Sequence, residues 1–218
     1  MRVLACLFLA CLATACASGH AAAPRWEHGE SLLQLRGDIT GYGTFERSGP
    51  DGVYDGSGEE IGTLLGAGAG LQWKLADGPV ALGLEGMFDV SSRHSGAGLY
   101  TPAGGATSEE LGDLDLLDVY GGPMASVFVG NSLRVYGAAG PLVQVGFYDQ
   151  SSPAGDDLGD SGFGLGWYVR AGAEARFGQS LLGGIGVRHA ASTLDLGGDL
   201  GDLELAGTTF FVSVSWLR

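Results

Sequence analysis

The stretch LQLRGDITGYGTFE, residues 33–46, sorts by parity into two kinds of residue. Its odd positions hold only Leu, Ile, Phe and Gly, whereas its even positions hold every polar and charged side chain. Successive side chains of a β-strand point to opposite faces. The stretch therefore predicts a strand with one apolar wall and one polar wall.

The same two-faced pattern recurs about seven more times before the carboxyl end. The predicted strands cover about 32–46, 61–75, 79–90, 116–129, 132–148, 163–177, 180–190 and 206–217. Long connections (47–60, 91–114, 149–162 and 191–204) alternate with short turns at 76–78, 130–131 and 178–179. This alternation is typical of a transmembrane up-and-down antiparallel β-barrel with long extracellular loops and short periplasmic turns. Pro123 and Pro141 cannot donate to a ladder, so we expect local irregularities there.

Composition narrows the class of protein further. The 218 residues carry a formal net charge of -14, which argues against nucleic acid as a partner because binding phosphates needs a basic surface. Beyond the amino terminus there is no run of 18 or more apolar residues, so no transmembrane helix is predicted there. A transmembrane strand needs only about 9–11 residues.

The amino terminus has the pattern of an export signal. Arg2 is followed by an apolar core and then by small residues, so residues 1–23 are interpreted as a signal peptide, 24–31 as a periplasmic lead and 32–218 as the barrel. All three cysteines lie within this signal segment, which leaves the mature chain without an internal disulfide. Ala13-Thr14-Ala15-Cys16 also resembles a lipobox, so lipidation of Cys16 stays open as an alternative to its removal.

Alternation alone does not decide which wall faces outward. A soluble, lipocalin-like barrel would turn its apolar wall inward around a ligand. Two features favour a membrane barrel: the charged wall carries many glycines, which suits a narrow interior, and aromatic residues collect at strand ends as a bilayer interface selects. The predicted girdles are Phe45, Phe88, Phe147, Phe163 and Phe210 at the long-loop end, and Trp73, Phe177 and Trp216 at the short-turn end.

With this export signal, strand count and loop pattern, the chain resembles the OmpA/OmpX-type outer-membrane barrels of Gram-negative bacteria. The segment Leu205 to Val212 also looks like the β-signal read by the barrel-assembly machinery, although the chain ends in Trp216-Leu217-Arg218 and not in an aromatic residue. The resemblance implies a cell outer-membrane location, insertion by that machinery, and contact with outer-membrane lipid and lipopolysaccharide. We expect a monomer.

The polar wall places charges inside the predicted barrel. The expected lumen charge network is Arg36, Asp38, Glu85, Asp118, Arg170, Glu174 and Arg188, with Arg134 and Arg176 on the same wall. Buried charges must pair or be hydrated, and side chains largely fill an eight-stranded barrel. The network therefore predicts a salt-bridged plug, with a gated narrow pore as the alternative.

Most acidic residues fall in the predicted long loops. The pattern Asp195-x-x-x-Asp199-x-x-Asp202-x-Glu204 offers oxygen atoms of the kind that bind Ca²⁺, but it matches no EF-hand spacing. Solvated acidic loops, or loops bridged to lipopolysaccharide by divalent ions, are the simpler interpretation. The chain has no paired-cysteine metal site, phosphate-binding loop or GxSxG elbow, so we expect no metal and no cofactor.

One enzymatic alternative rests on His189 and Ser192. Outer-membrane lipid A deacylases of the PagL type are also eight-stranded and carry a His-x-Ser-Asn motif; here one extra residue separates His from Ser, and the Asn is absent. In a regular strand the two side chains would have opposite parity, so a nucleophile–base contact would need a bulge. We therefore expect a non-enzymatic barrel with a structural, adhesion or narrow-pore role that presents acidic loops to the cell exterior.

Overall fold

A computed structural model of the chain describes residues 31–49, 52–57, 63–76, 79–97, 112–130, 132–150, 158–197 and 201–217, and every regular element in these ranges is a strand. The strands are β1 (Ser31–Gly49), β2 (Gly52–Ser57), β3 (Thr63–Ala76), β4 (Ala81–Ala97), β5 (Gly112–Val129), β6 (Leu133–Gln150), β7 (Leu158–Arg176), β8 (Leu181–Asp195) and β9 (Asp202–Leu217). The predicted signal peptide and periplasmic lead lie outside the described residues, apart from Ser31.

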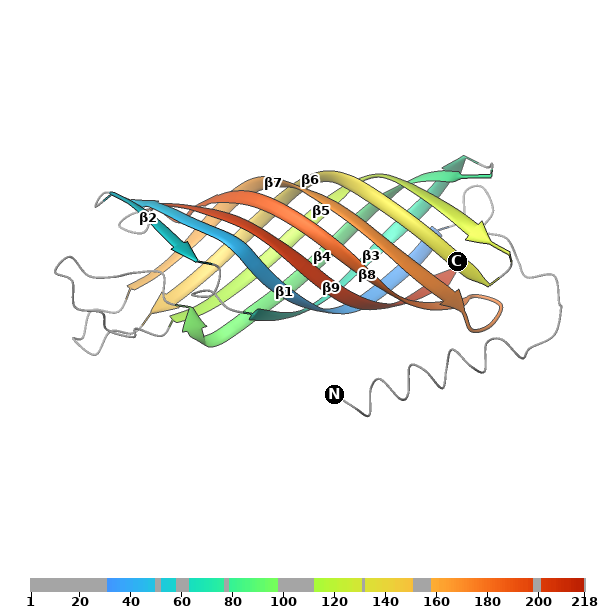
Figure 1. The fold of residues 1–218 in the computed structure, drawn as a ribbon, viewed down its shortest axis with the longest axis horizontal. Helices are drawn as coiled ribbons and strands as arrows, with labels where there is room; N and C mark the ends of the chain where they lie inside the picture. Colours follow the sequence, from blue (N-terminus) through green and yellow to red (C-terminus); the bar gives the residue numbers. More distant parts are fainter. Residues whose placement is uncertain are drawn as a thin grey trace.

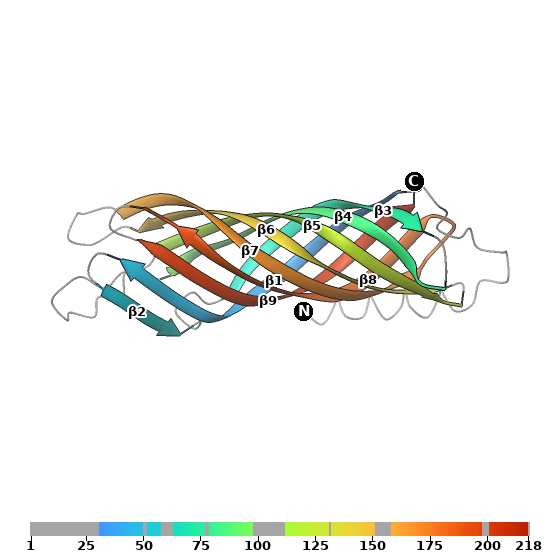
Figure 2. The same ribbon diagram turned by 90° about the horizontal axis from the view of Figure 1, so that it is seen from above.

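Eight of these strands form a closed antiparallel barrel. The hydrogen-bonded order is β1-β3-β4-β5-β6-β7-β8-β9, and β1 pairs with β9 to close the cylinder. The strands cross the long axis obliquely in both views (Figure 1 and Figure 2). The remaining strand, β2, pairs with the end of β1 from Thr44 to Gly49 and lies at one end of the barrel, opposite the end where β9 finishes (Figure 1). The predicted all-β, eight-stranded barrel is therefore confirmed.

The sequence misplaced the strand ends nearest the predicted long loops. Strands β4, β5, β7, β8 and β9 continue four to seven residues beyond the positions expected on that side, and β2 occupies part of the first predicted loop. At the opposite end the expected turns are close to those found. Gly130, in the turn between β5 and β6, has a φ of 63°, a left-handed conformation that glycine adopts without a steric penalty.

The two prolines coincide with an interruption in the β5–β6 ladder, as expected. Pairing between β5 and β6 stops at Tyr120 opposite Leu142 and resumes in the same register at Met124 opposite Ala138. Both Pro123 and Pro141 are exposed on the outside of the wall. A proline can lie in a sheet at a position where no ladder hydrogen bond requires its N–H. The register is therefore the same on both sides of the interruption, although three residue pairs are missing.

The outer wall is apolar along most of the barrel. Large apolar side chains stand exposed on all eight barrel strands, among them Leu65 and Leu165 at 65% and Phe210 at 66%. A soluble monomer does not leave such a continuous apolar surface in water, and the opposite, inward face of the same strands carries the buried arginines and carboxylates. The expected sidedness is confirmed along this part of the barrel, where the large apolar side chains face outward and the charged ones face inward. No helix in the described part of the chain has the length and hydropathy needed to cross a membrane.

The polarity of the wall reverses near the end that carries the longer connections. There the inward side chains are apolar and form one buried cluster: Leu64, Leu114, Leu116, Tyr148, Leu194, Leu196, Leu203 and Leu205, with Tyr42 against it. The neighbouring side chains of opposite parity are acidic: Asp113, Asp115, Asp195, Asp202 and Glu204. This end resembles a soluble barrel, because its interior is apolar and its outer surface is acidic. We call the buried residues the leucine cluster.

Candidate functional site: the charged lumen

The seven charged residues predicted to line the lumen all face inward. Each is at most 8% exposed: Arg36, Asp38, Glu85, Asp118, Arg170, Glu174 and Arg188. Arg134 is fully buried beside them, and Arg176, also on the polar wall, is the last residue of β7, at the short-turn end. The structure therefore brings the predicted network together in one interior, where each charge needs a partner.

Two ion pairs form the lower part of this network, nearer the short turns. Arg134 Nη1 lies 2.7 Å from Glu174 Oε2, and Arg170 Nη2 lies 2.6 Å from Glu85 Oε2, with all four side chains fully buried. Gln34 joins the two pairs, because its amide donates to Glu174 at 2.8 Å and its oxygen accepts from Arg170 at 2.9 Å. We call these five residues the lower network.

Further donors complete the coordination of the two glutamates. Glu174 Oε1 accepts hydrogen bonds from the Ser215 and Ser213 hydroxyls at 2.7 and 3.2 Å. Glu85 Oε1 accepts from the Tyr168 hydroxyl at 3.0 Å, and Arg170 Nε donates to Glu85 Oε2 at 3.1 Å. A buried carboxylate surrounded by donors in this way holds the strands that supply them in a fixed register.

The upper part of the lumen charge lies between the lower network and the leucine cluster. Arg188 contacts Asp118 at 2.8 Å and Asp89 at 3.1 Å, and Arg36 is ion-paired with Asp89. Asp118 also accepts from Gln144 at 2.7 Å. Asp38 lies beside them and has a single long contact, 3.7 Å from the Arg36 Nε. Arg36, Asp38, Asp89, Asp118 and Arg188 are the upper network.

Several members of the site were missed by the sequence reasoning. Asp89 pairs with two arginines, yet it is not among the residues that the sequence assigns to the network. The glutamines at 34, 72 and 144 link the ion pairs; Gln72, for instance, accepts from Arg134 at 2.6 Å. Their parity was the available signal, because every one shares the face of the predicted charges.

Aromatic rings separate the arginines within the lumen. The guanidinium carbons of Arg36 and Arg188 lie 5.3 and 4.9 Å from the centre of the Tyr120 ring, and that of Arg134 lies 4.7 Å from the Tyr136 ring. A cation above an aromatic face is attracted by the ring quadrupole. The rings therefore fill the interior and also stabilise its positive charges.

The glycine run of β3 makes room for the network. A Cβ placed on Gly66 would overlap the Oδ1 of Asp38, and one on Gly68 would overlap the Oδ1 of Asp89. The Gly66-Ala67-Gly68-Ala69-Gly70 segment thus presents a bare inner wall, into which side chains from β1 and β4 fit. This accounts for glycines on the polar wall of a narrow barrel.

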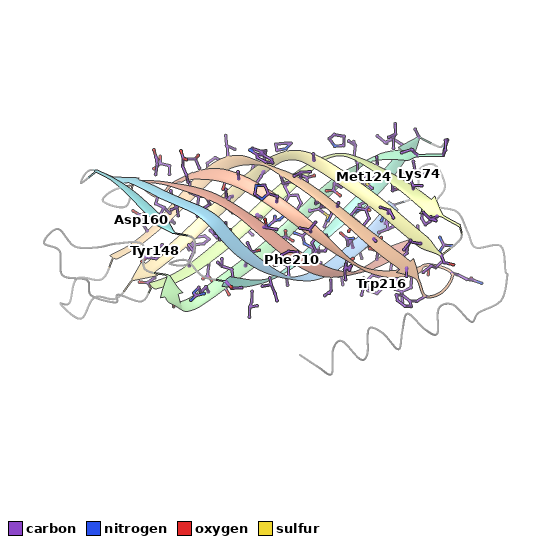
Figure 3. The ribbon with its side chains drawn as sticks, viewed as in Figure 1. Lys74, Met124, Tyr148, Asp160, Phe210 and Trp216 are labelled. Carbon is purple, nitrogen blue, oxygen red and sulfur yellow. The ribbon has the colours of Figure 1, made fainter. Side chains whose placement is uncertain are left out.

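The outer aromatic residues are only partly arranged as two girdles. Phe147 and Phe163 lie toward the loop ends of β6 and β7, and Trp73, Phe177 and Trp216 lie toward the short turns; all five are exposed. Phe88 and Phe210 are exposed at the midpoints of β4 and β9, as Figure 3 shows for Phe210, so their assignment to the long-loop girdle needs correction. Because the strands extend further toward the loops than expected, these two rings lie near the middle of their strands. The Phe45 side chain lies outside the described residues.

His189 and Ser192 lie on opposite faces of β8. The Ser192 hydroxyl donates to Gln144 at 2.7 Å inside the barrel, whereas His189 is exposed outside, with its Nδ1 3.2 Å from the Thr208 hydroxyl oxygen. Pairing of β8 with both neighbours runs without a register shift. The bulge required for a His–Ser catalytic contact is absent from this strand, so that pairing of residues was wrong.

The acidic residues that were considered as possible Ca²⁺ ligands are divided between the two sides of the turn that joins β8 and β9. Asp195 Oδ1 accepts from the Gly197 amide at 2.9 Å and so caps this turn, while Asp199 lies outside the described residues. In the part of the chain that the structure describes, no three acidic, histidine or cysteine side chains are grouped so that they could hold a metal ion.

The ends of the lumen are distinguished by their side chains. Figure 3 places Tyr148 and Asp160 at the end with the longer connections, and Lys74 and Met124 at the end with the short turns. Tyr148 belongs to the leucine cluster, and Met124 is buried in a second apolar cluster with Leu32, Tyr136, Leu142 and Leu182. The leucine cluster thus covers the long-loop end of the charged networks, while the second cluster lies among the charges and reaches the short-turn end at Met124 and Leu182.

Solved structures with the same fold support this description. The crystal structure of the attachment invasion locus protein Ail of Yersinia pestis, in complex with the heparin analogue sucrose octasulfate, has a TM-score of 0.52 at 16% identity and covers 88% of this chain and 100% of that one. OprG from Pseudomonas aeruginosa gives 0.53 at 11% identity, covering 89% and 99%. The outer membrane protease OmpT from Escherichia coli gives 0.52 at 9%, covering 87% and 97%.

At these identities the likeness concerns the fold alone. No functionally curated protein matches the sequence. The family model for the outer membrane protein beta-barrel domain matches residues 7–216, which is nearly the whole chain. Together with the apolar outer wall and the charged lumen, this match assigns the protein to the outer membrane of Gram-negative bacteria. The chain is a member of the outer membrane protein beta-barrel family.

Proposed function

We propose that this protein is a closed, non-enzymatic scaffold of the outer membrane that presents an acidic surface to the cell exterior. The filled lumen is the observation that carries the proposal. Four arginines and five carboxylates are buried there, the leucine cluster covers their long-loop end, and the side chains of the second apolar cluster lie among them. A conducting pore needs a hydrated path, whereas most of these charges are paired with one another.

The proposal favours the salt-bridged plug over the narrow pore. Opening a path would require disruption of the lower network, whose five residues are joined by bonds of 2.6 to 2.9 Å, and also displacement of the leucine cluster. The outward carboxylates around that cluster are the surface available for interaction. We infer that lipopolysaccharide and outer-membrane lipid surround the barrel, that the barrel-assembly machinery inserts it, and that it works as a monomer.

Planar-bilayer recording tests the closed lumen. The wild-type barrel should show no channel steps above the lipid background, and Arg170→Gln should behave in the same way, because the leucine cluster still covers the lumen. A gated pore would instead give wild-type openings that become larger or more frequent when Arg170 loses its charge. Such an increase would contradict the proposal, and heat-modifiable gel mobility of each sample confirms that folded barrels were recorded.

Incubation of the purified barrel with lipopolysaccharide tests the absence of enzymatic activity. We expect no release of fatty acid from either the wild type or His189→Ala, because His189 faces outward while Ser192 is bonded inside the lumen. Fatty acid released by the wild type and lost in His189→Ala would revive the deacylase alternative. Release that persists in the variant would indicate a contaminating esterase or a different site.

A further inference from the structure

The upper network contains more negative than positive groups. Its two cations are Arg36 and Arg188, and its three acids are Asp38, Asp89 and Asp118. The side chains of all five are at most 4% exposed. The lower network, in contrast, pairs two arginines with two glutamates. One acid in the upper network is therefore left without a matching cation within that network.

The contacts identify which acid is the additional one. Asp118 binds Arg188 at 2.8 Å and accepts from Gln144 at 2.7 Å, and Asp89 contacts both arginines. Asp38 has no hydrogen-bond donor on its buried Oδ2, and its nearest cation atom, the Arg36 Nε, is 3.7 Å away. That same Nε donates to Asp89 at 2.7 Å. Arg36 is thus directed at Asp89 and not at Asp38.

The residues paired with Asp38 on the two neighbouring strands offer no side-chain donor. Its register partners are Gly66 on β3, which has no side chain, and Phe211 on β9, whose ring is apolar. Gly66 makes room for the Asp38 carboxyl, because a Cβ at this position would overlap its Oδ1. A carboxylate in such a position, nearly buried and with no donor on its Oδ2, is disfavoured in its ionised form.

We propose that Asp38 holds a proton in the closed barrel, so that the lumen contains a binding site for one proton beside the Asp89–Arg36–Arg188–Asp118 ion pairs. The proton makes the upper network electrically neutral. The inference rests on the closed lumen proposed above, since water in an open channel would solvate the additional charge. The site links the packing of the lumen to the pH of its surroundings: loss of the proton leaves three negative charges around two arginines.

The other titratable groups around Asp38 are either charged and paired or uncharged. The groups that face it are Arg36 and Tyr42 on β1, Asp89 on β4, Asp118 and Tyr120 on β5 and Arg188 on β8, while β3 and β9 contribute no titratable side chain next to it. Both arginines bind other carboxylates, and both tyrosines are neutral at neutral pH. Asp38 is accordingly the group on which a proton changes the charge balance.

Asparagine substitution provides the test, because asparagine has the size of aspartic acid and stays neutral. In urea titrations of the refolded barrel in lipid vesicles at neutral pH, Asp38→Asn should keep the wild-type unfolding midpoint. Asp118→Asn is the matched control, and it should unfold at clearly lower urea because it removes a partner of Arg188. At alkaline pH the wild-type midpoint should fall below that of Asp38→Asn.

Infrared spectroscopy observes the proton directly. The wild type at neutral pH should show a carbonyl band of a protonated carboxyl that is missing from Asp38→Asn. The band should also weaken in Asp118→Asn, because loss of one carboxylate removes the excess negative charge that keeps Asp38 protonated. A loss of stability in Asp38→Asn as large as that in Asp118→Asn would overturn the proposal. A bound Na⁺ could also neutralise Asp38, so a wild-type unfolding midpoint that falls when choline replaces Na⁺ in the buffer would overturn it as well. Bilayer conductance of the same samples separates the two proposals: wild-type channel activity refutes the closed lumen, whereas a destabilised Asp38→Asn in a non-conducting barrel refutes only the proton site.

Discussion

Replacing Arg170 with methionine should lower the free energy of unfolding by about 3–5 kcal/mol, because it leaves Glu85 charged and buried without its cation. The Arg170 guanidinium lies 2.6 Å from Glu85 and donates to Gln34, so one substitution removes two contacts of the lower network. Methionine keeps most of the side-chain volume. The loss can be measured as the shift in urea-unfolding midpoint of the barrel refolded in vesicles, followed by tryptophan fluorescence.

The double variant Arg170→Met/Glu85→Leu is the control. With both charges gone, neither buried residue lacks a partner, and we expect most of the lost stability to return, since apolar replacement of a whole buried ion pair is often neutral. A full recovery is not expected because the Tyr168 hydroxyl donates to Glu85 in the wild type and would lose its acceptor. If the double variant were as unstable as the sum of the two single variants, the pair would not be the unit that stabilises the lumen.

Parity predicted the face of each side chain well where the strand crosses the apolar belt. The seven residues of the expected network are all inward, and apolar neighbours such as Leu35 and Ile39 are outward. The reason is physical: with period 2 and no slip of register, a single correct assignment of sidedness fixes every other residue on that strand.

Parity predicted the strand ends wrongly at the long-loop end of the barrel, where the inner face is apolar and the outer face is acidic. At Leu114 and Leu116 the leucines point inward and the aspartates between them point outward, the reverse of the pattern along the belt. The pattern of charges on one face and apolar residues on the other stops before these residues. It therefore predicts strands that are too short and places Asp113 and Glu204 in loops. Strands that continue beyond the apolar belt meet water outside and apolar packing inside, so their polarity must reverse.

The partners within the lumen could not be predicted at all. Parity places Asp38 and Asp89 on the same inner wall, but only the stagger between β1, β3 and β4 decides which of them Arg36 reaches. That stagger comes from pairing of whole strands and from the space left by glycines on β3. It cannot be derived from the residues of one strand.

Gly140→Val should prevent the barrel from folding, at a cost of at least about 3 kcal/mol, because overpacking against backbone leaves no flexible group to move aside. A Cβ on Gly140 would overlap the carbonyl oxygen of Gly121 and lie 3.0 Å from the Gly121 carbonyl carbon and the Gly122 Cα. These atoms belong to the interrupted stretch of the β5–β6 ladder, where the backbone of β5 leaves no room for a side chain at position 140. The expected result is loss of the heat-modifiable, faster-migrating form on unboiled gels.

Gly137→Val is the matched control on the same strand. Its Cβ would meet only the Arg170 carbonyl oxygen, at 3.6 Å, which is an ordinary contact. A β-branched residue suits a strand, so this variant should fold as the wild type does. If Gly140→Val folded equally well, β5 and β6 could separate at the prolines without loss of the barrel, and the close approach of Gly121, Gly122 and Gly140 would not be needed to seal the wall. If both variants failed, the defect would lie in valine on β6 in general and not in the contact with β5.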